Sequence, residues 1–237
     1  NDERCLPAQK WLHDFGYSEF LMREIDSIDF EYKSPEGANP YYDRTYNVAS
    51  CLYQLLAQAI HSQTFHDDFL HTKIIVIMKK SFKHSYPAFV KNARWHAITS
   101  LVCEQNAEEM SSFLPEAISI FIEDLNHVYE YRVFIIQFIN EIVKYQPFFA
   151  TYLVDEKVPN WILHFLLRFP NVTIFHSAIR EFVDNALKID ILAHVIVSTY
   201  TPVLIEEAIV QTNKVFLPTV IALIESIRKA GIENRTI

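Results

Sequence analysis

The chain has 237 residues, of which half are apolar and 14% are aromatic, and it carries a net charge of −8. This hydrophobic composition excludes an intrinsically disordered chain. The acidic balance argues against a general nucleic-acid binder, because neutralising phosphates requires a surplus of Lys and Arg.

Glycine is scarce, occurring only as Gly16, Gly37 and Gly231. The long interval between Gly37 and Gly231 therefore lacks the residue that most easily forms the positive-φ corners of β-turns and phosphate-binding loops. This absence favours an all-α protein. No apolar run approaches the roughly 18 residues of a membrane span, so we expect no membrane partner.

Hydrophobic periodicity predicts a succession of helices with short breaks. Prolines mark many of the starts, where their missing N–H costs nothing. One long loop is expected at 27–42, where Pro, Gly and Asn are crowded together. The predicted helices lie at 6–14, 18–26, 43–61, 67–83, 87–104, 107–125, 130–145, 147–154, 159–169, 174–188, 190–199, 202–212 and 214–229.

The helices are of two kinds. The helix at 174–188 has a single apolar stripe, whereas VFIIQFINEIV (133–143) is apolar on nearly all sides and must be buried between neighbours. A weak repeat accompanies this pattern. ARWHAITSLV (93–102), YRVFIIQFIN (131–140), FHSAIREFVD (175–184) and NKVFLPTVIA (213–222) align without gaps.

The second position of each segment carries a basic side chain, either arginine, lysine or histidine: Arg94, Arg132, His176 and Lys214. Arg44 precedes Arg94 in the same series. Their spacing is close to the period of about 40–47 residues in HEAT and armadillo units. We therefore predict one domain over 1–237, an armadillo/HEAT-like right-handed α-solenoid of about twelve to thirteen helices.

No catalytic constellation is recognisable, and we expect no enzyme, cofactor, metal or small-molecule substrate. His61, His66 and His71 are five residues apart, and such positions diverge by about 140° on a helix, which favours a polar turn over a metal site. The three cysteines are odd in number and contain no CxxC pair, which favours a reducing compartment. Cys51 and Cys103 lie in apolar contexts that predict buried thiols.

The aromatic segment Asn39-Pro40-Tyr41-Tyr42-Asp43-Arg44-Thr45-Tyr46 leads from the long loop into a helix. Tyrosine and arginine are enriched at protein interfaces. Packing of the tyrosines against the first turn of the helix is the alternative.

The segment YRVFIIQFINEIVKYQPFFATYLVDEKVPNWILHFLLRFPNVTIFHSAIREFVDNAL resembles the later part of the SAPS domain. That domain belongs to the Sit4-associated regulatory subunits of the protein phosphatase six type of serine/threonine phosphatase. KWLHDFGYSEFLMREID (10–26) resembles its Trp-Leu-led helix pair, and DRTYNVASCLYQLL (43–56) resembles its Asp-Arg…Asn-Ala-Ser helix. The chain departs from the family where two asparagines fall on Val172 and Thr173, leaving only Asn171 nearby.

This resemblance implies a non-catalytic helical scaffold that binds a phosphatase catalytic subunit and directs its targets, in the cytoplasm or also in the nucleus. It also implies that the ring of His176 is hydrogen-bonded to a neighbouring turn. The partner-binding residues that we expect are Tyr42, Arg44, Asn47, Arg94, Arg132, Asn171 and His176.

Two other functions stay open. An armadillo-type adaptor could use the acidic charge to bind basic peptides or cargo proteins. Such adaptors carry a regular ladder of Trp and Asn, whereas Trp11, Trp95 and Trp161 fall at different helix positions. The remaining alternative is a helical enzyme with an unrecognised site.

Overall fold

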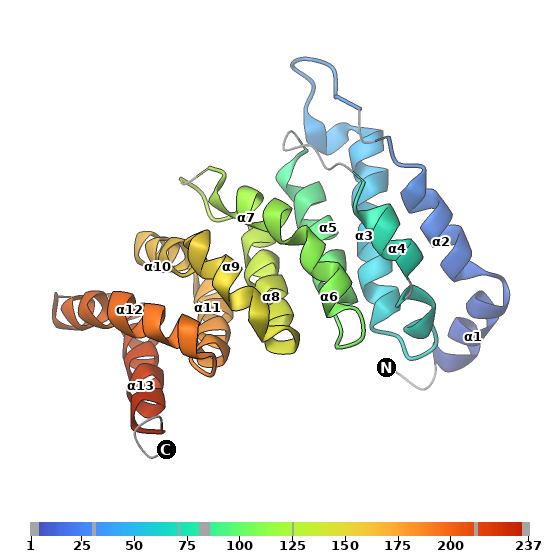
Figure 1. Ribbon diagram of the computed structural model, residues 1–237. Helices are drawn as coiled ribbons and strands as arrows, with labels where there is room; N and C mark the ends of the chain where they lie inside the picture. Colours follow the sequence, from blue (N-terminus) through green and yellow to red (C-terminus); the bar gives the residue numbers. More distant parts are fainter. Residues whose placement is uncertain are drawn as a thin grey trace. The chain divides into compact units, whose positions relative to one another are not determined.

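The computed structural model describes residues 5–29, 32–70, 72–80, 86–124, 126–210 and 213–233. Within these ranges all regular structure is helical, and no β-strand occurs (Figure 1). The predicted all-α fold class is therefore confirmed. The chain divides into two compact units, and the expectation of a single domain stays a prediction.

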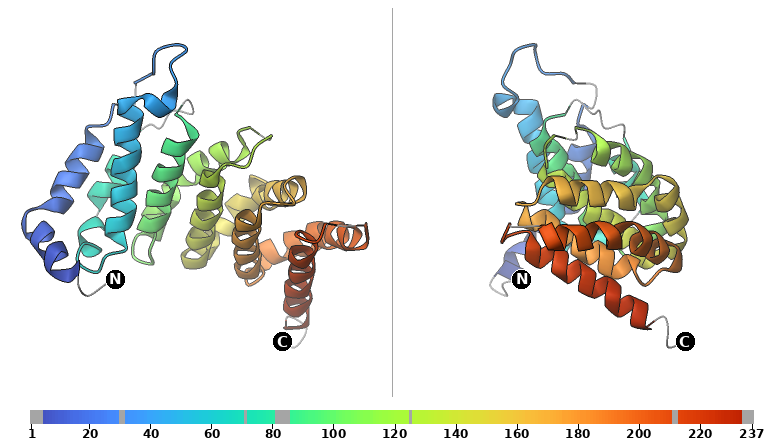
Figure 2. Two further views of the ribbon diagram at one scale, coloured as in Figure 1. Left: turned by 180° about the vertical axis from the view of Figure 1, so that it is seen from behind. Right: turned by 90° about the vertical axis from the view of Figure 1, so that its left-hand side faces the viewer.

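The first unit comprises Asn1–Phe113 and Tyr129–Phe134. Its core lies where α3 runs beside α5, which both views of the ribbon show (Figures 1 and 2). Leu56 of α3 and Trp95 and Ile98 of α5 are completely buried there, and each such side chain contributes roughly 1.5–3 kcal/mol to folding. The helices of this unit are α1 (Leu6–Asp14), α2 (Tyr17–Asp26), η2 (Pro40–Tyr42), α3 (Arg44–Ile60), η3 (Asp67–Phe69), α4 (Thr72–Met78), α5 (Ala88–Leu101), α6 (Ala107–Met110) and η4 (Ser111–Phe113).

The second unit comprises Leu114–Val128 and Ile135–Ile237, so α8 (Glu130–Tyr145) is shared between the units. Phe121, Phe165 and Phe175 form an aromatic part of its core, with edge-to-face contacts at 5.1 and 6.3 Å between ring centroids. Its other helices are α7 (Leu114–Ile122), η5 (Pro147–Phe149), α9 (Ala150–Asp155), α10 (Val158–Arg168), α11 (Thr173–Ala186), α12 (Asp190–Val210) and α13 (Leu217–Glu233).

Helix α8 has the burial that its sequence predicts. Ile135, Phe138, Ile139 and Ile142 are all completely inaccessible to solvent. An α-helix that is apolar on most sides must be covered on most sides, and here this expectation is confirmed.

The predicted helix boundaries fail in α12, where the separate helices at 190–199 and 202–212 are one. A proline inside a helix removes one hydrogen bond and costs roughly 3 kcal/mol. Tyr200 and Leu204, on either side of Pro202, are nevertheless both completely buried, and the Tyr200 hydroxyl donates to the Pro159 carbonyl oxygen at 2.6 Å. This shared core on both sides of the proline holds the helix continuous. Residues 211 and 212 lie outside the described residues.

Two other predicted helices are shorter or interrupted. The helix expected at 67–83 is η3 followed by α4, and residues 71 and 81–83 lie outside the described ranges. The helix expected at 107–125 is interrupted by η4 immediately before α7, whose first turn contains Pro115, a position where proline is tolerated. Residue 125 is not among the described residues.

Among the described residues, α12 is the helix long and apolar enough to cross a membrane by length and composition. The same helix packs on α9, α10 and α13 within the second unit. Since the core helices of non-membrane proteins meet the same criteria, this feature alone does not indicate a membrane protein.

Candidate partner-binding site

The start of α3 is organised around the carboxylate of Asp43, the N-cap residue of this helix. Its Oδ1 accepts hydrogen bonds from the backbone N–H groups of Thr45 (2.9 Å) and Tyr46 (3.4 Å). Its Oδ2 accepts from the hydroxyls of Tyr32 (2.6 Å) and Ser34 (2.7 Å). One side chain therefore caps the helix and ties the 27–42 loop to it.

These hydrogen bonds shift two pKa values in opposite directions. The Tyr32 hydroxyl, with help from Ser34 and the two backbone N–H groups, lowers the pKa of the Asp43 carboxyl below its usual range. The same bond raises the pKa of the Tyr32 hydroxyl. Asp43 is thus held as the charged acceptor that the cap needs.

The turn immediately before the cap is also fixed. The Asn39 side-chain oxygen accepts from the Tyr41 N–H at 3.0 Å, and the Asn39 carbonyl accepts from the Tyr42 N–H at 3.0 Å. The Asn47 amide donates back to the Tyr41 carbonyl at 3.0 Å. The Tyr41 ring stacks on Phe89 of α5, with ring centroids 5.2 Å apart.

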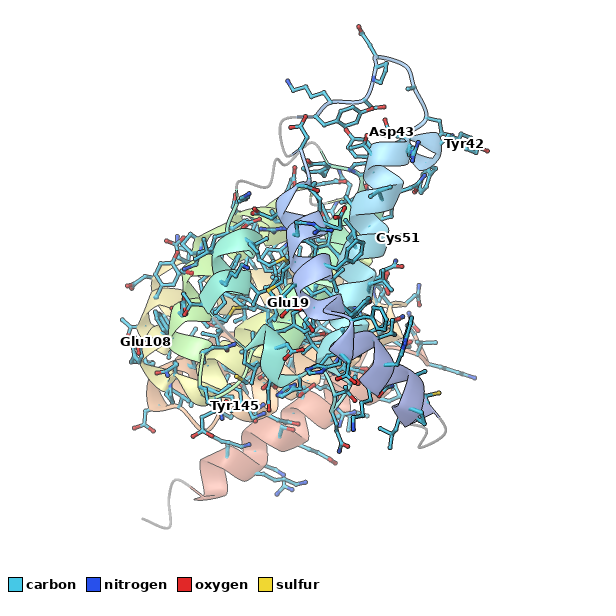
Figure 3. All side chains as sticks on the ribbon, turned by 90° about the vertical axis from the view of Figure 1, so that its right-hand side faces the viewer. Glu19, Tyr42, Asp43, Cys51, Glu108 and Tyr145 are labelled. Carbon is cyan, nitrogen blue, oxygen red and sulfur yellow. The ribbon has the colours of Figure 1, made fainter. Side chains whose placement is uncertain are left out.

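This fixed turn displays residues that the sequence singles out. Tyr42 is 86% exposed, and Arg44 and Asn47 are also exposed. We call Tyr41, Tyr42, Arg44 and Asn47 the α3 cap surface; Figure 3 shows Tyr42 and Asp43 together at the end of α3. Tyr46 is buried in the first turn, as the packing alternative predicts, while Tyr41 and Tyr42 are exposed. The interface role of the segment stays a prediction.

A pocket of about 290 Å³ adjoins the α3 cap surface, between the end of α2 and the first half of α3. Arg44, Val48 and Leu52 line its α3 side, and Glu24 and Asp29 line its α2 side. Arg44 thus lines a pocket whose other walls include both apolar and acidic side chains.

Arg94 and Arg132 have a different environment from the exposed Arg44. Both side chains are completely buried, so neither presents a surface to a partner. The Arg94 Nη2 atom donates to the carbonyl oxygen of Met78, the last residue of α4, at 2.9 Å. A cation at this position satisfies a carbonyl that the helix leaves unpaired and complements the negative end of the helix dipole.

His176 is also buried, with 2% of its surface exposed. Its Nε2 lies 3.0 Å from the carbonyl oxygen of Phe169, the residue that ends α10, and its ring contacts Phe216. The predicted hydrogen bond of the ring to a neighbouring turn is confirmed. Burial lowers the pKa of the imidazole, and the bond to Phe169 offsets this only in part. The neutral ring therefore donates its Nε2 hydrogen to the end of α10.

Asn171 is exposed in the second unit, where its side-chain oxygen accepts from the Asn213 amide at 2.9 Å. Asn213 in turn accepts from the N–H groups of Val215 and Phe216 ahead of α13. Of the seven predicted residues, the structure therefore groups Tyr42, Arg44 and Asn47 at one site. Whether any of the seven binds a partner stays a prediction.

The histidine-rich segment forms a turn held by local contacts. His66 Nδ1 lies 2.9 Å from the Ile60 carbonyl oxygen, and His61 Nε2 lies 3.2 Å from the Ser100 hydroxyl. His71 lies outside the described residues. In the described part of the chain, no three His, Cys, Asp or Glu side chains are grouped as metal ligands would be.

Sequence reasoning missed the supports of the α3 cap surface, and it also misplaced Cys51. The α3 cap surface is held by residues outside it, namely Tyr32 and Ser34 through Asp43 and Phe89 through Tyr41. Of these contacts, only the capping role of Asp43 could be predicted from sequence, because aspartate is a preferred N-cap residue. Cys51 is exposed on α3 (Figure 3) instead of buried. The reason is that it shares an outward face with Val48 and Leu55, which are 48% and 42% exposed.

The chain matches no family model, no curated protein and no solved structure. The resemblance to the SAPS domain therefore stays a prediction.

Proposed function

We propose that the chain is a non-catalytic scaffold that binds the catalytic subunit of a serine/threonine phosphatase of the protein phosphatase six type. In this proposal its helices form an armadillo/HEAT-like right-handed solenoid, and the α3 cap surface contacts the phosphatase. The observation that carries the proposal is a regular sequence separation between hydrogen-bonded partners on neighbouring helices.

In the first unit this separation is close to 38 residues. Asn92 bonds to the Glu130 carboxylate and to the Tyr131 N–H, at separations of 38 and 39. His61 and Ser100 are also 39 residues apart. Longer separations, such as the 50 residues between Ser18 and Asp68, span the 27–42 loop.

In the second unit the separation is slightly larger. Asn126 and Arg168 are 42 residues apart, as are Asn171 and Asn213. The Pro159 carbonyl and the Tyr200 hydroxyl are 41 residues apart. Stacked repeats of about 40–47 residues bring equivalent positions of adjacent repeats together at this interval.

A second regularity concerns the series that begins with Arg94. Arg94 donates to the end of α4, and His176 donates to the end of α10. In each case a buried side chain of one helix, from the middle of α5 or the first turn of α11, bonds to a carbonyl at the end of the helix before it. Equivalent capping in separate parts of the chain supports a repeated unit.

The α3 cap surface supports the binding part of the proposal. A tyrosine and an arginine held on a rigid turn lose little conformational entropy when they bind, and both residue types dominate interface energetics. Purified chain should form a complex with the phosphatase six catalytic subunit in biolayer interferometry. The variant Arg44→Glu should weaken that complex about tenfold or more while the melting temperature stays unchanged.

Arg228→Glu is the matched control, because Arg228 is an exposed arginine of α13 in the other unit. It should bind like the unaltered chain. No complex at micromolar concentrations of the unaltered chain would contradict the proposed function. Equal binding by the Arg44→Glu and Arg228→Glu variants would contradict the placement of the contact.

A further inference from the structure

A second pocket lies entirely in the first unit, between α3, α5 and the first turns of α8. Its volume is about 250 Å³. Gln54 and Gln58 of α3 form one side, Asn92 and His96 of α5 form another, and Glu130 of α8 closes a third. Phe134 lies beside His96, with the two rings stacked at 4.6 Å between centroids.

The carboxylate in this pocket is held in place by a neighbouring amide. The Asn92 amide donates to Glu130 Oε2 at 3.1 Å, while the Asn92 side-chain oxygen accepts from the Tyr131 N–H at 2.8 Å. The side-chain amide of Asn92 is thereby held through both its nitrogen and its oxygen, and it orients the Glu130 carboxylate. Within the described ranges the second carboxylate oxygen, Oε1, accepts no hydrogen bond.

The remaining polar groups of the pocket are free to accept hydrogen bonds. In the described part of the chain, the side chains of Gln54 and Gln58 make no hydrogen bond, and neither does the ring of His96. Burial and the nearby His61 lower the pKa of His96, so its ring is neutral at pH 7. The lining therefore offers one negative charge, several acceptors and no positive charge.

We propose that this pocket binds the guanidinium group of an arginine side chain presented by a protein partner. A guanidinium carries five N–H donors in a planar fork, which matches one carboxylate oxygen flanked by amide oxygens. An anion is disfavoured by Glu130, and the described residues offer no group of three metal ligands.

The surroundings of the pocket point to a protein segment as the source of the arginine. Leu55, adjacent to Gln54 on α3, is 42% exposed, and Val48 two turns earlier is 48% exposed. A segment with an apolar residue beside its arginine could cover this face while the arginine enters the pocket. The site does not depend on the phosphatase proposal, because it uses none of the residues of the α3 cap surface.

The test uses the blocked peptide acetyl-Leu-Gly-Arg-Gly-amide and a matched peptide in which citrulline replaces arginine. Citrulline keeps the shape of the side chain but has no charge. In titrations followed by NMR, the arginine peptide should shift the side-chain amide resonances of Gln54, Gln58 and Asn92. The citrulline peptide should bind about tenfold more weakly, the usual difference between a charge-assisted and a neutral hydrogen bond.

Two variants locate the site. Glu130→Gln should weaken the arginine peptide about tenfold, whereas Glu108→Gln, at an exposed position on α6 (Figure 3), should leave its affinity unchanged. Thermal melts should show that both variants remain folded, and Gln58→Leu offers a second test if Glu130→Gln does not fold. The proposal is wrong if the three amide resonances do not move, if both peptides bind equally, or if spermidine shifts the same resonances with the same affinity.

Discussion

At the residue scale, the three arginines of the predicted series show how far sequence can lead. Arg44, Arg94 and Arg132 occupy similar sequence patterns, yet Arg44 is exposed at the start of α3 while the other two are completely buried. The pattern predicts their position on a helix. It does not predict whether a neighbouring helix covers that position, because the covering residues lie far away in sequence.

Removing the buried guanidinium should therefore cost far more than removing the exposed one. Arg94→Leu leaves the Met78 carbonyl without this donor and disturbs a packed interior, so we expect a loss of about 2–4 kcal/mol in the free energy of unfolding. Arg44→Leu should change it by less than about 0.5 kcal/mol. Urea denaturation measures both values, and similar losses in the two variants would contradict the burial described here.

Asp43 should govern how the first unit responds to acid. Its folded-state pKa is lowered, so its contribution to stability is complete above its unfolded pKa of about 4 and is lost as the pH falls through the lower folded value. Asp43→Ala should lower the melting temperature at pH 7 by roughly 2–4 °C. It should also flatten the dependence of the melting temperature on pH below about 4.

The exposed Asp184 provides the control for this measurement, since among the described residues it makes no hydrogen bond or ion pair. Asp184→Ala should have the same melting temperature as the unaltered chain, both at pH 7 and below about pH 4. A melting curve of Asp43→Ala that matches it throughout would show that the carboxylate does not anchor the loop.

His176 should act in a different pH window. Its folded-state pKa is lowered below the ordinary value of about 6.5, so protonation favours the unfolded chain as the pH falls from about 6.5 to the folded value. His176→Gln should remove this part of the pH dependence, and differential scanning calorimetry from pH 7.5 to 5 measures it. His194, exposed on α12, is the control. Equal flattening of the curve by His194→Gln would show that His176 is not the titrating group.

At the element scale, the periodicity and the prolines predict most helices in their correct order. Both signals are local, since a proline in the first turn and an apolar stripe act within one helix. The wrong prediction of a helix break within α12 has a cause outside that helix. Tyr200 and Leu204 are buried by other helices of the second unit, and this tertiary burial overrides the breaking tendency of Pro202.

Replacing that proline should stabilise the protein. Pro202→Ala restores a backbone donor inside α12 and relieves the crowding of the preceding turn, so the free energy of unfolding should rise by about 1–2 kcal/mol. Pro218, exposed in the first turn of α13, is the matched control and should give no gain when replaced by alanine. Calorimetry distinguishes them, and destabilisation by Pro202→Ala would mean that α12 depends on its proline.

The same contrast between local and distant signals applies to the candidate site. Tyr42, Arg44 and Asn47 are close in sequence, and their grouping could be predicted from the aromatic segment that contains them. The pocket around Glu130 could not, because its lining comes from three helices whose residues span 54–134. Only the separation of 38 residues between Asn92 and Glu130 hints that these positions meet.

At the scale of the whole molecule, the proposed solenoid rests on hydrogen bonds that recur at 38–42 residues within each unit. Such a spacing arises when each helix pair contacts only the next pair along the chain. A serial arrangement would spread the binding surface over several helices, as a scaffold requires. It would also make the molecule more extended in space than a compact domain with the same number of residues.

Small-angle X-ray scattering of the purified chain tests this central claim most directly. A compact domain of this length has a radius of gyration of about 18 Å. Serial stacking predicts a value clearly above this, together with an asymmetric distribution of interatomic distances that extends to a long tail. A radius of gyration at the compact value with a symmetric distribution would contradict the solenoid and the scaffold function built on it.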